Sequence, residues 1–109
     1  MRIWDLPPRV LCRQHLLGEH RELHAIWQVL TKGKRGYANH PETLRWKGKL
    51  AALYRRHEQQ VQEMSRRGYH HESPLNLRHA TGSSRQRARL ITPTQQRQLL
   101  RRKGCDCFS

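Results

Sequence analysis

Residues 9–31 read RVLCRQHLLGEHRELHAIWQVLT, and this stretch decides the fold class. When successive residues are placed about 100° apart, as in an α-helix, its large apolar side chains fall within one stripe: Leu16, Leu23, Ile26, Trp27 and Leu30. The next run, KGKRG at residues 32–36, combines two glycines with basic residues, which is typical of a helix end followed by a loop. The stretch therefore predicts a long helix that packs one face on a core.

A second long helix is expected after this basic loop. It begins within residues 39–42, NHPE, because Pro41 suits the first helical position and Glu42 complements the positive end of a helix. Its apolar residues recur at steps that match one helical face: Trp46, Leu50, Leu53, Val61 and Met64. Gly68 closes it.

The two ends of the chain carry the remaining elements. The prolines at positions 7 and 8 favour an extended conformation for residues 1–8. A short helix is expected from Pro93 to Lys103, with Thr92 as its N-cap and Gly104 as its stop. No segment alternates with a period of two. We therefore predict an all-α fold: a single small domain over residues 1–109, with two long helices, a short C-terminal helix and an extended N-terminus lying across the helices.

The charge balance points to a polyanionic partner. The chain has 22 Lys and Arg against 8 Asp and Glu, which gives a net charge of +14. Nucleic acid is the partner that such a surface favours most, ahead of an anionic membrane. No apolar run approaches the roughly 18 residues that a membrane span needs, and the start lacks the apolar core of a signal peptide. We therefore expect a cytoplasmic protein that associates with the nucleoid when it is bound to DNA.

The cysteines and histidines give a weak metal signal. The chain has three cysteines, Cys12, Cys105 and Cys107, and an odd number in a cytosolic protein argues against a disulfide framework. The single residue between Cys105 and Cys107 is a poor match to zinc-ligand spacing. A metal bound by the histidines at positions 70, 71 and 79 is an alternative, but a solvated loop is the favoured interpretation. We expect free thiols and no bound metal.

Two glutamates on the first helix are candidate functional residues. Glu22 lies beside the apolar stripe, and Gly18 and Ala25 on the same flank leave a shallow trough around it. Glu19 falls inside the stripe, so we expect it to be partly buried. A carboxylate against an apolar face needs a partner. The two alternatives are a functional carboxylate and a structural ion pair with an arginine such as Arg13, Arg21 or Arg2.

The stretch QHLLGEHREL at residues 14–23 resembles the signature of the pyrimidine-dimer DNA glycosylases, the endonuclease V type repair enzymes of phage and bacteria. Three further blocks follow the family in the same order: MRIW at residues 1–4, GKR at 33–35, and the second long helix up to EMSRRGY at 63–69. The resemblance covers residues 1–76. The basic C-terminal part, residues 77–109, differs from the aromatic-rich tail of the phage enzymes.

The resemblance implies a mechanism and its residues. In this family the α-amine of the chain start attacks C1′ of the damaged nucleotide, an imine forms, and β-elimination nicks the strand. Arg2 is too bulky for ordinary methionine removal, so the resemblance assigns the nucleophile to Met1. Glu22 matches the catalytic glutamate. His15 and Arg21 flank the site, and together with Arg2 they are expected to contact phosphate or sugar.

The resemblance also implies damaged double-stranded DNA as the partner of a monomeric enzyme that needs no cofactor and no metal. The basic residues expected to bind phosphates are Lys34, Arg35, Lys49, Arg56, Arg66, Arg67 and the arginines at 85, 87 and 89. Two alternatives stay open at this point. One is a related glycosylase or abasic-site lyase for another base lesion, and the other is a basic DNA-binding protein without catalytic activity.

Overall fold

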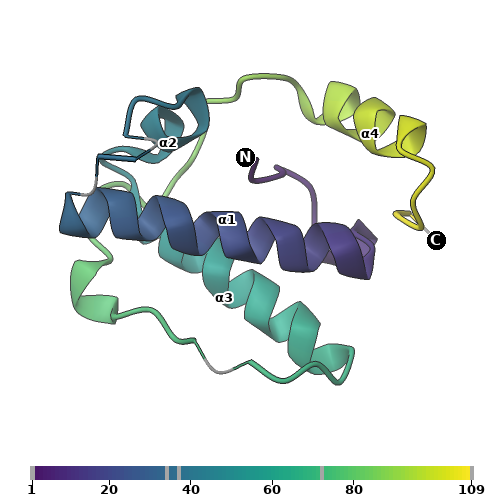
Figure 1. Cartoon of the computed structure of the whole chain (residues 1–109), viewed down its shortest axis with the longest axis horizontal. Helices are drawn as coiled ribbons and strands as arrows, with labels where there is room; N and C mark the ends of the chain where they lie inside the picture. Colours follow the sequence, from purple (N-terminus) through teal and green to yellow (C-terminus); the bar gives the residue numbers. More distant parts are fainter. Residues whose placement is uncertain (1, 34, 37, 72, 109) are drawn as a thin grey trace.

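The computed structural model describes residues 2–33, 35–36, 38–71 and 73–108. It is helical, and the described residues form no strand beyond one isolated β-bridge, so the all-α prediction is confirmed (Figure 1). In chain order the elements are η1 (Pro8–Val10), α1 (Arg13–Lys32), α2 (Pro41–Trp46), α3 (Leu50–Arg66), η2 (Leu77–His79) and α4 (Pro93–Arg102). None of the helices in the described ranges is both long and apolar enough to span a bilayer.

Local sequence signals fix the ends of α1 and α4. Gly33 closes α1 with a positive φ of 66°, and its amide donates to the carbonyl of Val29 at 3.1 Å. The helix begins at Arg13 rather than near residue 9, because the preceding prolines lead into the short turn η1. At the start of α4, Thr92 and Gln95 form a reciprocal capping box, which confirms the predicted N-cap.

The prediction of one continuous second helix is wrong, because the chain breaks between α2 and α3. Gly48 adopts a positive φ of 76° at the break. A distant segment replaces the lost helical bonds: the carbonyls of Thr81 and Ser83 accept from the amides of Ala51 and Ala52 at 2.8 and 3.0 Å. The first amides of a helix have no partner within it. Residues 81–83 therefore stabilise a helix start in the middle of the predicted helix.

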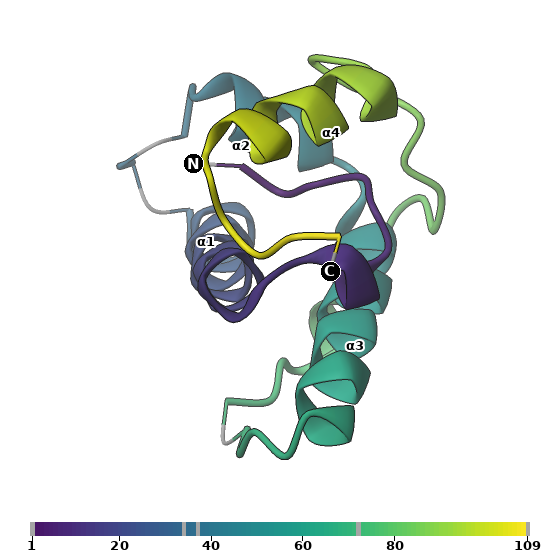
Figure 2. The ribbon, with the colours of Figure 1, turned by 90° about the vertical axis from the view of Figure 1, so that its right-hand side faces the viewer.

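The extended N-terminal segment, residues 2–7, runs through the middle of the molecule. Figure 2 shows it between α1 and α3 on one side and α2 and α4 on the other. Ile3, Trp4 and Leu6 are at most 6 % exposed. Burial of such side chains contributes about 1.5–3 kcal/mol each. The expectation that this segment lies across the helices is confirmed, and the segment is itself part of the core.

The core has two parts, and the N-terminal segment contributes to both. Leu6 packs in the same cluster as Leu16, near the beginning of α1. Ile3 packs in the other cluster, with Leu23 and Ile26, which lie about two to three turns further along the same helix. Read backwards from Leu6, the segment therefore follows α1 towards its C-terminal half, and it carries the start of the chain in that direction.

Candidate active site

A buried ion pair between α1 and α3 holds the N-terminal segment. The Glu19 carboxylate is 2 % exposed and receives hydrogen bonds from the guanidinium of Arg56 at 2.9 Å and from the side-chain amide of Gln60. The same carboxylate accepts from the backbone amide of Trp4 at 2.7 Å. Arg56 also donates to the carbonyl of Leu6 at 2.7 Å. The pair thus satisfies backbone groups of the segment that would otherwise be buried without partners.

A second buried pair, from α2, holds the residues nearer the chain start. Glu42 accepts from the backbone amide of Ile3 at 3.3 Å and from Arg45 at 2.6 Å. Arg45 in turn donates to the carbonyl of Ile3 at 2.9 Å and to the carboxylate of Asp5 at 2.8 Å. Burial alone would lower the pKa of Arg45, but the hydrogen bonds to Glu42 and Asp5 outweigh it and raise that pKa. The guanidinium therefore stays charged.

Glu22 differs from these structural carboxylates. It is half-buried on α1, one turn after Glu19, and within the described part of the chain its side chain has no hydrogen-bond or ion-pair partner. The other described acidic residues all have partners: Asp5, Glu19, Glu42, Glu58, Glu63 and Asp106. A carboxylate without a partner in a chain of net charge +14 is available to a ligand or to a developing positive charge.

The structure thus distinguishes Glu19 from Glu22, both of which the sequence analysis treated as candidates. The structural interpretation holds for Glu19, although its partner is Arg56 rather than any of the three arginines considered. Arg2 instead places its guanidinium over the ring of Trp4, 5.2 Å from the centroid. A Cβ added at Gly18 would meet no described atom within 4 Å. The trough predicted around Glu22 is therefore open at Gly18.

Two predicted residues, Met1 and Lys34, lie outside the described residues. The structure therefore does not place the amine that the resemblance assigns as the nucleophile. It does place the backbone that leads to that amine. The amides of Ile3, Trp4 and Asp5 are each bonded to a buried or half-buried side chain, from Glu42, Glu19 and Gln96. The chain is thus fixed up to two residues from its start.

The predicted phosphate-binding residues fall into two groups. Arg21, Arg35 and the arginines at 85, 87 and 89 are exposed. Arg66 is also exposed but pairs with Glu63 at 2.5 Å. Lys49 is half-buried and donates to Gln86 at 2.8 Å.

The prediction of a phosphate contact is wrong for Arg56, because its guanidinium is buried against Glu19 and the carbonyl of Leu6. Arg67 is directed inward as well, because it donates to Glu63 and to the carbonyl of Leu11, both at 2.6 Å. A guanidinium committed in this way has few donors left for a phosphate. Sequence alone does not distinguish these arginines from the exposed ones, since Glu19, Leu6 and Leu11, which hold them inward, are far away in the sequence.

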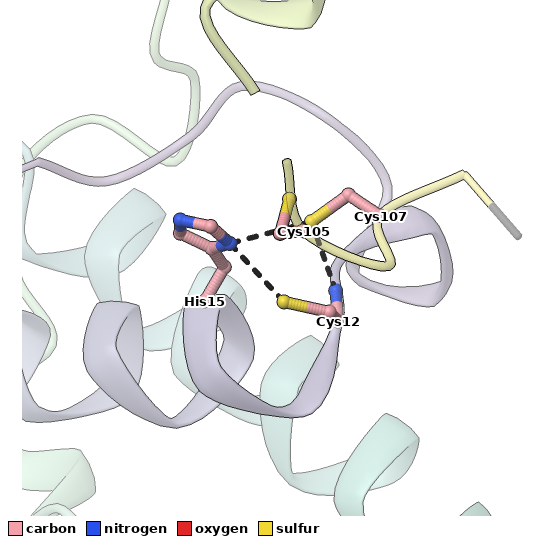
Figure 3. A group of neighbouring side chains, drawn as sticks. All are labelled: Cys12, His15, Cys105 and Cys107. Carbon is pink, nitrogen blue, oxygen red and sulfur yellow. Dashed lines mark hydrogen bonds between the residues drawn. The ribbon is translucent and has the colours of Figure 1, made fainter. Parts of the chain in front are cut away.

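His15 lies among the three cysteines rather than on an open surface (Figure 3). Its Nδ1 atom is 3.1 Å from the Cys12 sulfur and 3.4 Å from the Cys107 sulfur. Burial lowers the pKa of His15, and the charge of nearby Lys103 adds to this effect. Burial also raises the pKa of the Cys107 thiol to about 12. Sequence spacing gave no sign of this cluster, because its members come from the two ends of the chain.

Four histidines form a second cluster on the other side of α1: His20, His24, His57 and His71. The Nε2 atom of His20 is 3.0 Å from that of His24 and 3.1 Å from that of His71. Burial, followed by the charges of the other three histidines, lowers the pKa of His24 to about 4. The expected solvated loop is therefore wrong for His71. His79, by contrast, is exposed and lies outside the cluster.

Comparison with known proteins identifies the family. A protein-family model described as pyrimidine dimer DNA glycosylase matches residues 1–77 of the 109. No curated protein and no solved structure matches the chain. The matched range includes the N-terminal segment, the buried pairs of Glu19 and Glu42, and Glu22. The chain therefore belongs to the pyrimidine dimer DNA glycosylase family, which implies a glycosylase that acts on pyrimidine dimers in DNA.

Proposed function

We propose that this protein repairs ultraviolet-damaged DNA by cleaving the N-glycosidic bond at cyclobutane pyrimidine dimers and then nicking the strand by β-elimination. The family supports the first step. The observation that carries the second is the half-buried carboxylate of Glu22, which lacks a partner in the described structure and lies on the helix that the N-terminal segment follows. A lyase of this type needs an amine and a carboxylate close together at one sugar.

The α-amine of Met1 is the proposed nucleophile. It attacks C1′ of the damaged nucleotide, the electrons of the C1′–N bond pass to the base, and the sugar ring opens to give an imine. An unperturbed α-amine has a pKa of about 7.7–8.0, so a substantial part is neutral at physiological pH. The bonds that fix Ile3 and Trp4 limit the positions that the chain start can reach. Such restriction favours attack by reducing the entropy lost at the transition state.

Glu22 has two successive roles in this proposal. Its carboxylate first stabilises the positive charge that develops on the sugar and then on the iminium nitrogen. It next accepts the proton from C2′, and the electrons of that C–H bond expel the 3′ phosphate. Both roles require a carboxylate whose oxygens are not occupied by an arginine. Glu22 meets this requirement among the described residues, and Glu19 does not, because Arg56 and Gln60 occupy its oxygens.

DNA binding in the proposal depends on the exposed cations. The enzyme must bend the duplex and displace a base, which costs a few kcal/mol and less at a lesion. Arg21, Arg35 and the arginines at 85, 87 and 89 are exposed, and in the proposal they offset that cost by binding phosphates. Arg56 and Arg67 are not, so fewer phosphate contacts are expected than from a count of basic residues. We also propose that the enzyme acts as a monomer in the cytoplasm, at the nucleoid.

The Glu22→Gln variant tests the proposed function. We expect it to bind a duplex that contains a dimer with unchanged affinity but to lose strand scission by at least 100-fold, as for loss of a general base (about 10²–10⁴-fold). Gln14→Ala, an exposed change two turns earlier on α1, is the matched control and should cleave normally. Normal cleavage by Glu22→Gln would show that this carboxylate has no catalytic role.

The choice of substrate tests the alternatives. The same duplex should be offered with a cyclobutane dimer, with an oxidised base and with an abasic site. Cleavage at the dimer and at the abasic site supports the proposal. Cleavage at the oxidised base but not at the dimer would favour a relative with another lesion, and binding without cleavage would favour a DNA-binding protein without catalytic activity.

A further inference from the structure

The three thiols of the chain and the imidazole of His15 meet at one point, although they come from opposite ends of the sequence (Figure 3). Cys12 lies immediately before α1, His15 lies in its first turn, and Cys105 and Cys107 lie in the tail after α4. The three sulfurs and one imidazole nitrogen all lie within 4.8 Å of one another. We propose that these four residues bind a zinc ion that pins the C-terminal tail to the start of α1.

The spacing of the ligand atoms fits a tetrahedral ion. Zinc lies about 2.3 Å from sulfur and about 2.0 Å from nitrogen, which places tetrahedral ligands about 3.5–3.8 Å apart. The Nδ1 atom of His15 is 3.1 Å from the Cys12 sulfur and 3.4 Å from the Cys107 sulfur. Because the four ligand atoms lie within 4.8 Å of one another, shifts of at most about 1 Å would bring them to tetrahedral spacing and admit the ion. Three cysteines and one histidine are also a standard ligand set for structural zinc.

The surroundings of the cluster support a metal site. The backbone amide of Cys12 donates to the Cys107 sulfur at 3.0 Å, a contact that stabilises the negative charge of a thiolate. Cys12 and Cys105 also line an open groove of about 550 Å³, which gives an ion access from solvent. All the cysteines of the chain take part. The sequence analysis did not predict this site because zinc-ligand spacing rules look for two pairs of ligands that are close in the sequence. Here one pair is Cys12 with His15 and the other is Cys105 with Cys107, and the first cysteines of the two pairs are 93 residues apart.

The zinc ion would have a structural role. It would close a loop from Cys12 to Cys107, next to the bond between the Phe108 amide and the Val10 carbonyl at 2.7 Å. The tail would then hold η1 and the beginning of α1, and α4 would stay over the N-terminal segment. Bound metal adds its binding free energy to that of folding when the unfolded chain lacks the site.

A second proposal comes independently from the histidine cluster. The Nε2 atom of His57 is buried and has no hydrogen-bond partner in the described structure. Its Nδ1 atom is held by Glu58 at 2.9 Å, and that of His20 is held by Gln60 at 2.8 Å. These bonds place the Nδ1 hydrogens outward and turn the Nε2 lone pairs inward, as in metal-binding histidines. We propose that His20, His24, His57 and His71 bind a second divalent metal ion through Nε2.

Metal content tests both proposals. The untagged chain is freed of metal with a chelator, loaded with Zn²⁺, desalted, and measured for zinc per chain by mass spectrometry. Two equivalents are expected. Cys105→Ser and His71→Gln, each in a segment outside the helices, should each lose one equivalent, whereas the control His79→Gln should keep both. Full zinc retention by Cys105→Ser would overturn the first proposal, and full retention by His71→Gln would overturn the second.

Two measurements on the unchanged chain keep the proposals falsifiable if a variant misfolds. Loading with Co²⁺ should give the near-ultraviolet charge-transfer absorption of thiolate ligands. A thiol reagent should react slowly with the zinc-loaded protein and quickly with all three thiols after chelation. Thiols that react equally fast in both states would overturn the cysteine site. If the thiols of the zinc-loaded protein react slowly, the cysteine site holds one zinc ion. A total zinc content of one equivalent or less in that protein would then overturn the histidine site.

Discussion

Glu19 and Glu22 lie one turn apart on α1, but replacing each with glutamine should have very different effects on the stability of the fold. Glu19→Gln removes the negative charge from a buried pair, in which Arg56 is 9 % exposed and Glu19 is 2 % exposed. The guanidinium is then buried without a counter-ion, which costs about 3–5 kcal/mol. Glu22→Gln removes a half-buried charge that has no partner in the described structure, so stability should change by no more than about 0.5 kcal/mol.

Urea unfolding followed by tryptophan fluorescence measures this difference. Small proteins lose about 1–3 kcal/mol of stability per molar urea, so Glu19→Gln should lower the unfolding midpoint by at least about 1 M. Glu22→Gln should have the same urea unfolding midpoint as the unchanged chain. The double variant Glu19→Gln, Arg56→Met removes both charges and should recover part of the loss, because the unpaired cation is gone. Equal midpoints for the two single variants would refute this separation of a structural from a functional carboxylate.

Three further outcomes follow from the structure. Gly82→Ala should destabilise the protein by more than about 2 kcal/mol in thermal melts, because its Cβ would lie 2.2 Å from a facing backbone carbonyl; Gly68→Ala, with a similar positive φ but open space, should cost only the backbone strain of about 1–2 kcal/mol. Hydrogen bonds from Arg66 and Arg67 lower the pKa of Glu63, and they outweigh the effect of burial, which would raise it. This carboxylate therefore stabilises the fold above its unfolded pKa of about 4.3, and the stability difference between the unchanged chain and Glu63→Gln should shrink as the pH falls below about 5. Arg35→Gln should reduce the slope of log affinity against log salt for duplex DNA by about one, and an unchanged slope would exclude a phosphate contact there.

Local signals in the sequence were sufficient for α1 and α4. The apolar stripe and Gly33 define α1, and the capping box of Thr92 and Gln95 defines the start of α4. The break between α2 and α3 could not be predicted in this way. Apolar residues continue with helical spacing across it, and the bonds that stabilise it come from residues 81–83, far along the chain. A helix end that depends on a distant backbone segment leaves no local pattern.

The candidate site shows the same limit. Glu22 was found through its resemblance to a family motif, and its position on α1 agrees with the helical wheel. Which glutamate is neutralised could not be predicted, because the deciding residue, Arg56, lies on α3. Arg56 itself was misassigned to DNA for the same reason. The thiol cluster was missed because Cys12 and Cys107 lie at opposite ends of the sequence and come together only in the folded chain.

The central claim is that the α-amine of the chain start attacks the sugar next to Glu22. Borohydride reduction during turnover of a duplex with a cyclobutane dimer tests it most directly, because it converts the imine into a stable covalent bond. The trapped adduct should map by peptide mass spectrometry to the α-nitrogen of residue 1, and acetylation of that nitrogen should abolish the adduct while DNA binding persists. An adduct on a lysine side chain, or trapping that survives acetylation, would contradict the account.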